Sequence, residues 1–455
     1  MSDAMALVWF RLDLRLIDNP ALDAAVRVGG NIVPVFIWAP EEEEPWAPGA
    51  ACRWWLHQSL SSLDGQLRRR GSRLIVRRGP SLATLRDLVE ETDAKAVFFN
   101  RRHEPALISR DTAIERELPT QSFNSALLFE PGEIWNAAGK PFRVFTAFWK
   151  AYLARAEQVD APGDSPSQIP APARWPKSLA LTALELEPKI NWSTGLRNAW
   201  TPGEESARQL LKRFVRSGVR KYPELRDRPD VRGTSRLSPH LHFGEVGPRQ
   251  VWQVLRDHPS QAAGTYLRQL VWREFAHHLL FHFPHTTDEP LRPEFAKFPW
   301  RSDAKLLQAW QQGRTGFPLV DAGMRELWQT GWMHNRVRMM VASFLVKDLL
   351  LPWLQGARWF WDTLVDADLA NNTLGWQWVA GCGADAAPYF RVFNPETQRA
   401  KFDPRDDYVR RWVPELGRLG SPPPILDHAV ARERALEAFA SLRGGNDGVA
   451  GPCTV

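Results

Sequence analysis

The chain has 455 residues, of which 44% are hydrophobic and 24% are charged, and its net charge at pH 7 is +6. This length predicts two or three domains, and the composition is typical of a globular protein rather than a disordered one. The longest mostly apolar run, residues 339–346, is far shorter than a membrane-spanning helix, so we expect no membrane span. The acidic start without a signal peptide and the scattered Cys52, Cys382 and Cys453 predict a reducing, cytoplasmic location.

Two features of the composition bear on function. The positive net charge is compatible with a nucleic-acid partner without proving one. The chain also contains 22 tryptophans against 5 tyrosines, which is several times ordinary tryptophan usage. Most of these indoles are expected to fill the core. The remaining tryptophans are expected to serve a function that favours an indole, such as stacking on a ligand or one-electron redox chemistry.

The first 130 residues alternate between strand-like and helix-like patterns. Helices are expected to begin at Pro20, with Asn19 as the N-cap, and to cover residues 53–70 and 81–91. Apolar runs predict strands over residues 6–11, 31–38, 73–77 and 95–99. This alternation predicts an α/β domain with a parallel sheet and helices on both faces. No G-x-G-x-x-G follows the first strand, so a typical dinucleotide site is not predicted there.

The later part of the chain has a different character. Prolines recur from about residue 157 to residue 202, and the hydrophobic residues there show no clear periodicity, as in a long surface connector. Beyond Gly203 the patterns are helical and strand signals are rare. We therefore predict an α/β domain over residues 1–130, an interdomain connector over 131–202, a larger all-helical domain over 203–442 and a flexible tail over 443–455.

Two groups of residues in the helical part could bind a ligand. The hydroxyls of Thr234, Ser235 and Ser238 precede a predicted helix and suit a pyrophosphate or another anion, although an ordinary N-cap arrangement is the alternative. Trp376 and Trp378 are two apart in a predicted helix, so their indoles should point to different sides and could serve different ligands.

A third group lies on a predicted helix that starts near residue 335. Asn335, Arg338 and Met339 have the spacing that places side chains on one helix face. A buried arginine at position 338 would need a carboxylate partner, and Asp366 or Asp368 could supply it.

Long segments of the chain resemble the DNA photolyase/cryptochrome family, and most closely the bacterial class I cyclobutane pyrimidine dimer photolyases. The resemblance is carried by WFRLDLRLIDNPAL (residues 9–22), TGWMHNRVRMMVASFLVKDLL (330–350) and NNTLGWQWVAGCGADAAPYFRVFNP (371–395). It implies a deoxyribodipyrimidine photo-lyase activity, in which light-excited reduced FAD donates an electron to a flipped cyclobutane dimer of UV-damaged DNA. The dimer then splits into two pyrimidines and the electron returns.

The resemblance implies an FAD buried in the helical domain and assigns residues to it by position. The residues assigned to the FAD phosphates and ribityl chain are Tyr222, Thr234, Ser235, Arg236, Leu237 and Ser238. The residues assigned to the lining of the pocket are Gln269, Trp272, Arg273, Asn335 and Arg338. Asp366 should pair with Arg338, and Asp368 should contact the flavin edge. Asn372 should lie beside flavin N5, where a polar neighbour tunes the stable redox state.

The resemblance also divides the tryptophans by role. Trp376, Trp353 and Trp300 match an electron-transfer chain that runs from the flavin to the surface. Trp272 and Trp378 match the pair of indoles that flank the flipped dimer, where aromatic faces stack on bases. The other residues assigned to DNA binding are Arg226, Gln269, Asn335, Arg336, Met339 and Arg391. The implied chemistry requires no metal, and we expect the protein to be a monomer.

The sequence departs from the class I pattern in two places. Gln269 stands where class I enzymes usually carry Glu, as in (6-4) photolyases, although His334-Asn335 replaces the His-His pair of those enzymes. The Asn-Glu pair that binds methenyltetrahydrofolate in some relatives is absent near Ala106-Leu107. Folate is still the expected antenna, with a deazaflavin, a second flavin or no antenna as alternatives. A cryptochrome-like blue-light sensor, a (6-4) photolyase-like enzyme and a non-photochemical flavoprotein remain alternative functions.

Overall fold

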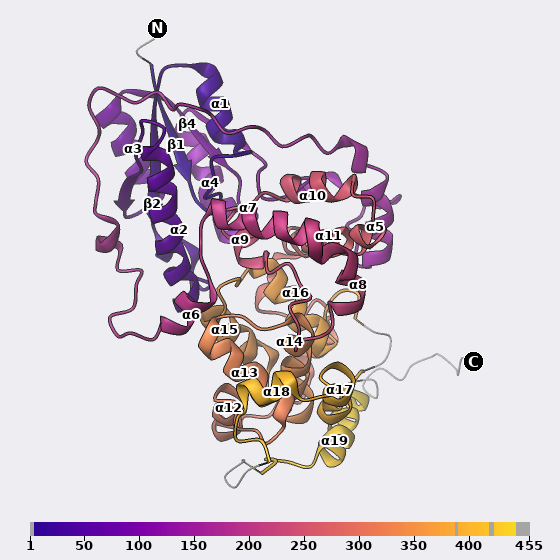
Figure 1. Cartoon of the computed structure of the whole chain (residues 1–455). Coiled ribbons are helices and arrows are strands. Elements are labelled where there is room, and N and C mark those ends of the chain that lie inside the picture. The colour runs from indigo at the N-terminus through magenta and orange to yellow at the C-terminus, as the bar shows by residue number, and fades with distance from the viewer. Residues whose placement is uncertain (1–3, 387–389, 418–422, 443–455) are drawn as a thin grey trace. The chain divides into compact units, whose positions relative to one another are not determined.

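The computed structural model describes residues 4–386, 390–417 and 423–442. They form two compact units, drawn in Figure 1. The first comprises the chain up to residue 226 together with residues 233–284 and 361–371, and the second comprises residues 227–232 and 285–360 and the chain from residue 372 onward. The first unit thus joins part of the predicted helical domain to the α/β region. The predicted limits at residues 130, 202 and 442 stay predictions, and the predicted tail lies outside the described residues.

A five-stranded parallel sheet forms the core of the first unit, in the order β3-β2-β1-β4-β5. The strands are β1 (Met5–Phe10), β2 (Asn31–Trp38), β3 (Ile75–Arg78), β4 (Ala94–Asn100) and β5 (Thr120–Phe123). The connecting helices are α1 (Pro20–Val28), α2 (Ala50–Arg68), α3 (Ser81–Thr92) and α4 (Pro105–Glu117). The direction of the crossovers reverses between β3 and β4, and right-handed connections then place helices on both faces of the sheet.

Local sequence explains why most of these elements were predicted correctly. The Asn19 side chain accepts a hydrogen bond from Leu22 N at 3.2 Å, and Pro20 occupies the first turn of α1, as the sequence predicts. β1, β2, β3 and β4 were each predicted to within two residues. β5 was not predicted, because this four-residue edge strand has the sequence TQSF and contains no apolar run.

The rest of the first unit is helical or irregular. Its helices are α5 (Phe145–Leu153), α6 (Thr194–Ala199), α7 (Glu204–Arg213), α8 (Tyr222–Leu225), α9 (Ser238–His242), α10 (Pro248–Arg256) and α11 (Ala262–His282). Residues 157–193 contain no α-helix or strand, which agrees with the proline-rich connector. α5 is a regular helix inside the predicted connector, because Phe145, Phe148 and Tyr152 follow helical spacing and are all buried.

The described part of the second unit is helical and contains no strand. Its helices are α12 (Ala304–Gln311), α13 (Pro318–Thr330), α14 (Asn335–Ser343), α15 (Trp353–Thr363), α16 (Leu369–Ala380), α17 (Pro395–Phe402), α18 (Asp407–Trp412) and α19 (His428–Ser441), with α15 and α16 each shared in part with the first unit. The prediction of a helical region after an α/β region is confirmed. No helix among the described residues is both long and apolar enough to cross a membrane.

Candidate functional site

Helix α11 carries three of the predicted site residues in the first unit: Gln269, Trp272 and Arg273. Gln269 and Trp272 are three residues apart, so their side chains share one helix face. The Arg226 guanidinium donates a hydrogen bond to Gln269 Oε1 at 3.2 Å. The structure thus brings together two side chains that were predicted separately to contact DNA. The contact also fixes the orientation of the Gln269 amide, whose nitrogen remains as the donor.

The indole of Trp272 is stacked on a second aromatic ring. Its ring centroid lies 3.7 Å from that of Phe145 on α5, and the two ring planes are within 8° of parallel. Trp272 is only partly buried, whereas the Phe145 side chain is 1% exposed. A ring that is supported by a neighbour and still partly exposed can offer an aromatic surface to a base.

The segment predicted to hold the FAD phosphates folds around Tyr266. Ser235 Oγ lies 2.8 Å from Tyr266 Oη, and the ring of the buried Tyr222 meets the ring of Tyr266 edge-on at 5.2 Å. Ser235 Oγ also accepts a hydrogen bond from Leu237 N, which closes a local turn before α9. Arg236 has a left-handed backbone with φ of 56°. Tyr266 therefore contacts both Tyr222 and Ser235, while the binding of FAD phosphates by these residues stays a prediction.

A small cavity, open to solvent and bordered by several charged side chains, lies in the first unit between β-strand ends and α11. Two predicted cofactor residues, Arg273 and Asp368, line it. His242 and His277 also line it, and their ring nitrogens lie 3.9 Å and 3.3 Å from Asp368 Oδ2. Burial raises the pKa of Asp368, but the charge of His277, hydrogen bonds from His242 and His277, and the charge of Arg273 outweigh it and hold that pKa well below the usual range.

The chemistry of this cavity fits a polar cofactor. His277 Nδ1 is buried and has no hydrogen-bond partner among the described residues, so the cavity offers a group that a ligand could satisfy. Burial lowers the pKa of the neighbouring His103 to about 3, so its ring is neutral near pH 7. The cavity thus offers a guanidinium (Arg273), a carboxylate (Asp368) and a buried imidazole (His277), side chains that suit the polar groups of a dinucleotide.

The start of α14 carries four predicted site residues in the second unit: Asn335, Arg336, Arg338 and Met339. Asn335 Nδ2 lies 4.0 Å from Met339 Sδ, and an Arg336 guanidinium nitrogen lies 3.9 Å from the same sulfur. Arg336 also forms an ion pair with Asp227 at 2.8 Å. Arg338 Nε donates to the carbonyl of Met333 at 2.7 Å. Because Asp366 lies in the first unit, its predicted pairing with Arg338 stays a prediction.

The part of α16 in the second unit directs its indoles to different surroundings, as the spacing predicts. Trp376 is 2% exposed and meets Phe360 edge-on at 5.0 Å and Trp310 at 6.3 Å. Trp378 donates from Nε1 to the carbonyl of Asp385 at 3.0 Å. The buried Gln377 between them donates to the carbonyls of Thr286 and Glu289 and accepts from Leu291 N. These bonds fix the rotation of the helix and hence both indoles.

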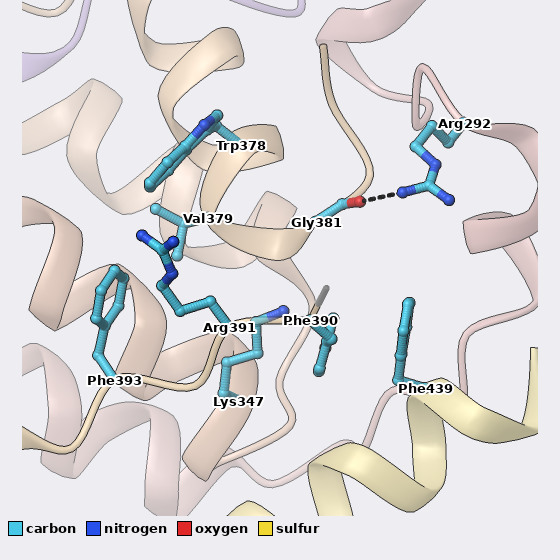
Figure 2. Close-up of a pocket in the computed structure, with 9 residues that line it drawn as sticks. All are labelled: Arg292, Lys347, Trp378, Val379, Gly381, Phe390, Arg391, Phe393 and Phe439. Atoms are coloured by element: carbon cyan, nitrogen blue, oxygen red, sulfur yellow. Dashed lines mark hydrogen bonds between the residues drawn. The ribbon is translucent and has the colours of Figure 1, made fainter. Parts of the chain in front are cut away.

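Trp378 lines a second small cavity, also open to solvent, shown in Figure 2. Arg391, predicted to contact DNA, lines the same cavity, as do the rings of Phe390, Phe393 and Phe439. The buried Lys347 donates from Nζ to the carbonyl of Ala380 at 2.8 Å and lies over the Phe390 ring. Burial lowers the pKa of Lys347 well below its ordinary value. Arginines and aromatic rings that line one cavity, here Arg292 and Arg391 with the three phenyl rings, are typical of surfaces that bind single-stranded nucleic acid.

The remaining predicted residues lie in the second unit. Asn372 donates from Nδ2 to the carbonyl of Ala357 at 3.0 Å. Trp353 is buried, and Trp300 packs its ring 4.3 Å from that of Phe298. The order of electron transfer through Trp376, Trp353 and Trp300 stays a prediction.

Sequence reasoning missed several side chains that support these residues: Phe145, His277, Trp310 and Gln377. Gln377 stands inside the GWQW segment that the sequence singles out, so position alone could have indicated it. The other three carry no local signal, because each acts through a contact with a residue distant in sequence.

Comparison with known proteins agrees with this geometry. Residues 6–173 match the family model described as DNA photolyase, and residues 266–422 match the model described as FAD binding domain of DNA photolyase. The chain is 45% identical to the deoxyribodipyrimidine photo-lyase of Agrobacterium fabrum over 97% of this chain and 99% of that one. It is 40% identical to cryptochrome-1 of Arabidopsis thaliana, over 98% of this chain and 68% of the cryptochrome.

A solved structure is also closely similar. A bacterial class III photolyase from Agrobacterium tumefaciens superposes with a TM-score of 0.93 at 44% identity, and the match covers 98% of each chain. The expected FAD-binding domain is thereby confirmed. The more specific expectation of a class I enzyme stays a prediction, since this similar structure is that of a class III enzyme.

Proposed function

Because this chain belongs to the DNA photolyase/cryptochrome family, we propose that it is a light-driven repair enzyme that splits cyclobutane pyrimidine dimers in UV-damaged DNA. The observation that carries the proposal is on one face of α11: the partly exposed Trp272 indole lies one turn from Gln269, whose amide is hydrogen-bonded by the Arg226 guanidinium. A blue-light sensor would need FAD but would have no need of a base-binding surface. Bound reduced FAD would supply the photoexcited electron that opens the dimer.

The residues of this chain then have separate tasks in binding. Trp272 and Trp378 stack on the flipped dimer, an interaction worth about 1–3 kcal/mol per base. Gln269 donates from its amide nitrogen to a pyrimidine carbonyl. Arg226, Arg336 and Arg391 contact phosphates, and Asn335 and Met339 border the dimer. Phosphate contacts position the duplex, whereas contacts with the dimer select the lesion.

A second set of residues serves the cofactor. Tyr222 and residues 234–238 hold its phosphates and ribityl chain, while Arg273, Arg338, Asp366 and Asp368 orient the ring system. Asn372 presents a neutral amide rather than an acid beside N5. Trp376, Trp353 and Trp300 carry electrons inward from the surface, because an indole can lose and regain one electron. We further propose a monomer that acts in the bacterial cytoplasm and uses methenyltetrahydrofolate as antenna.

A repair assay tests the proposed function. A duplex with one cyclobutane thymine dimer is illuminated with blue light in the presence of reduced enzyme, with a dark sample as control. We expect intact thymines only in the illuminated sample. A matched duplex with a (6-4) photoproduct should remain unrepaired. Repair of the (6-4) lesion alone would favour the (6-4) photolyase alternative, and FAD photoreduction without repair of either lesion would favour a cryptochrome-like sensor.

Binding to damaged duplex should weaken steeply with salt, because each phosphate contact releases condensed counterions. Replacing the exposed Arg391 with alanine should weaken binding and lower the slope of log affinity against log salt by about one unit, with FAD content unchanged. Fluorescence anisotropy at several salt concentrations measures both quantities. An affinity independent of salt would contradict the assignment of these arginines to phosphates.

Gln269→Glu should raise the repair yield per photon and change dimer affinity little. A glutamine amide, or a glutamate carboxyl in its protonated form, can donate one neutral hydrogen bond worth about 1 kcal/mol, so affinity is preserved as long as the new carboxyl is protonated. A protonated carboxyl is the stronger donor where negative charge develops on the pyrimidine carbonyl. Quantum yield and affinity are measured on the same dimer-containing duplex. An unchanged or lower yield would show that the pocket compensates for Gln269 elsewhere.

A further inference from the structure

The ring stack beneath Trp272 involves a helix to which neither the sequence nor the family resemblance assigns a role. Helix α5 packs against α11 within the first unit, and both helices are labelled in Figure 1. Phe145 begins α5, and its ring lies face to face with Trp272 at 3.7 Å. The ring of Trp149, one turn later, lies 6.4 Å from that of Phe145 with the planes 17° apart. Three rings, Trp149, Phe145 and Trp272, are therefore nearly parallel.

Phe145 is itself held firmly. Its side chain is 1% exposed and meets the ring of Phe275 edge-on at 5.8 Å. The guanidinium carbon of Arg268 lies 5.3 Å from the centre of the Phe145 ring. A ring packed on several sides cannot rotate freely, so it fixes the plane of the ring stacked on it.

From this geometry we infer that Phe145 is a positioning residue for the Trp272 indole, which it holds at the angle needed to receive the flipped dimer. The inference rests on the proposed role of Trp272 in DNA binding. An indole already ordered in the free protein loses little conformational freedom when a base stacks on it, so affinity gains from preorganisation. Without Phe145, the indole would have to be ordered at each binding event.

Phe145→Leu keeps an apolar side chain in the core but removes the stacking face. We expect its affinity for dimer-containing duplex to fall about five-fold, which corresponds to the loss of one aromatic pair that contributes about 1 kcal/mol. Phe145→Tyr keeps the ring and should bind within about two-fold of the unchanged protein. Phe148→Leu is the matched control, because Phe148 is an equally buried ring of α5 that packs on Phe275, His278 and Tyr152.

A double-mutant cycle separates positioning from a general loss of stability. In a Trp272→Ala background, Phe145→Leu should change dimer affinity by less than about two-fold, since the indole that it positions is gone. An equal loss in both backgrounds, or a loss of the same size in Phe148→Leu, would overturn the inference. So would unchanged affinity in Phe145→Leu itself. If Trp272→Ala alone binds dimer normally, the proposed role of Trp272 fails, and the inference fails with it.

Discussion

Trp376→Phe is expected to remove most of the light-driven FAD reduction that an external reductant supports, while the FAD content stays the same. The phenyl ring preserves the packing against Phe360 and Trp310, so the helix should hold its place. A phenyl ring cannot give up one electron at the potentials open to indole. The rate should fall about ten-fold or more, since each ~1.4 kcal/mol added to a barrier is a factor of ten. Transient absorption after a blue flash measures the rate.

A matched control keeps this prediction specific. Trp192 is a partly exposed indole in the predicted connector, and Trp192→Phe should leave the photoreduction rate unchanged. Undiminished photoreduction in Trp376→Phe would mean that another indole carries the electron. Trp310 would then be the first to test, since it is fully buried and in ring contact with Trp376.

Asp368→Asn is expected to cost about 3–5 kcal/mol of unfolding free energy near pH 7, because the variant leaves buried histidines without their charged partner. Asp368 lies 3.3 Å from His277 and 3.9 Å from His242. The folded pKa of Asp368 is depressed, so its stabilising effect is complete above the unfolded pKa of about 3.9 and is lost as the pH falls further. The difference between the two proteins should therefore shrink as the pH falls below about 4, where the carboxylate becomes protonated.

Denaturant unfolding across this pH range, with FAD content recorded in parallel, tests the role of Asp368. The control is Asp362→Asn in the same segment of the chain. Asp362 Oδ1 accepts from Ala50 N at 2.8 Å, and an asparagine oxygen can accept the same bond. Asp362→Asn should thus change stability by less than about 1 kcal/mol. Equal stability of Asp368→Asn and the unchanged protein at pH 7 would contradict the structural role assigned to Asp368.

Much of the fold could be predicted from short stretches of sequence. The Asn19 cap, Pro20 in the first turn and the apolar runs of β1, β2 and β4 specify their elements through neighbouring residues alone. The alternation of these elements then predicts a parallel sheet. Strand β5 was not predicted because its residues carry no apolar pattern, and only its pairing with β4 makes it a strand. Helix α5 was not predicted because residues 131–202 were assigned as a whole to a connector, on the basis of the prolines that follow this helix.

The same distinction between local sequence and long-range packing applies to the candidate site. The sequence by itself determined the family, because long motifs such as residues 330–350 and 371–395 carry the resemblance, and the resemblance then assigned the indoles, arginines and hydroxyls of the site by position. Only the tertiary structure decided that Phe145 lies under Trp272, that Arg226 reaches Gln269 and that His277 faces Asp368. Each of these contacts joins separate helices or loops through packing. The distance and angle of such a contact depend on how whole elements pack, which no local periodicity encodes.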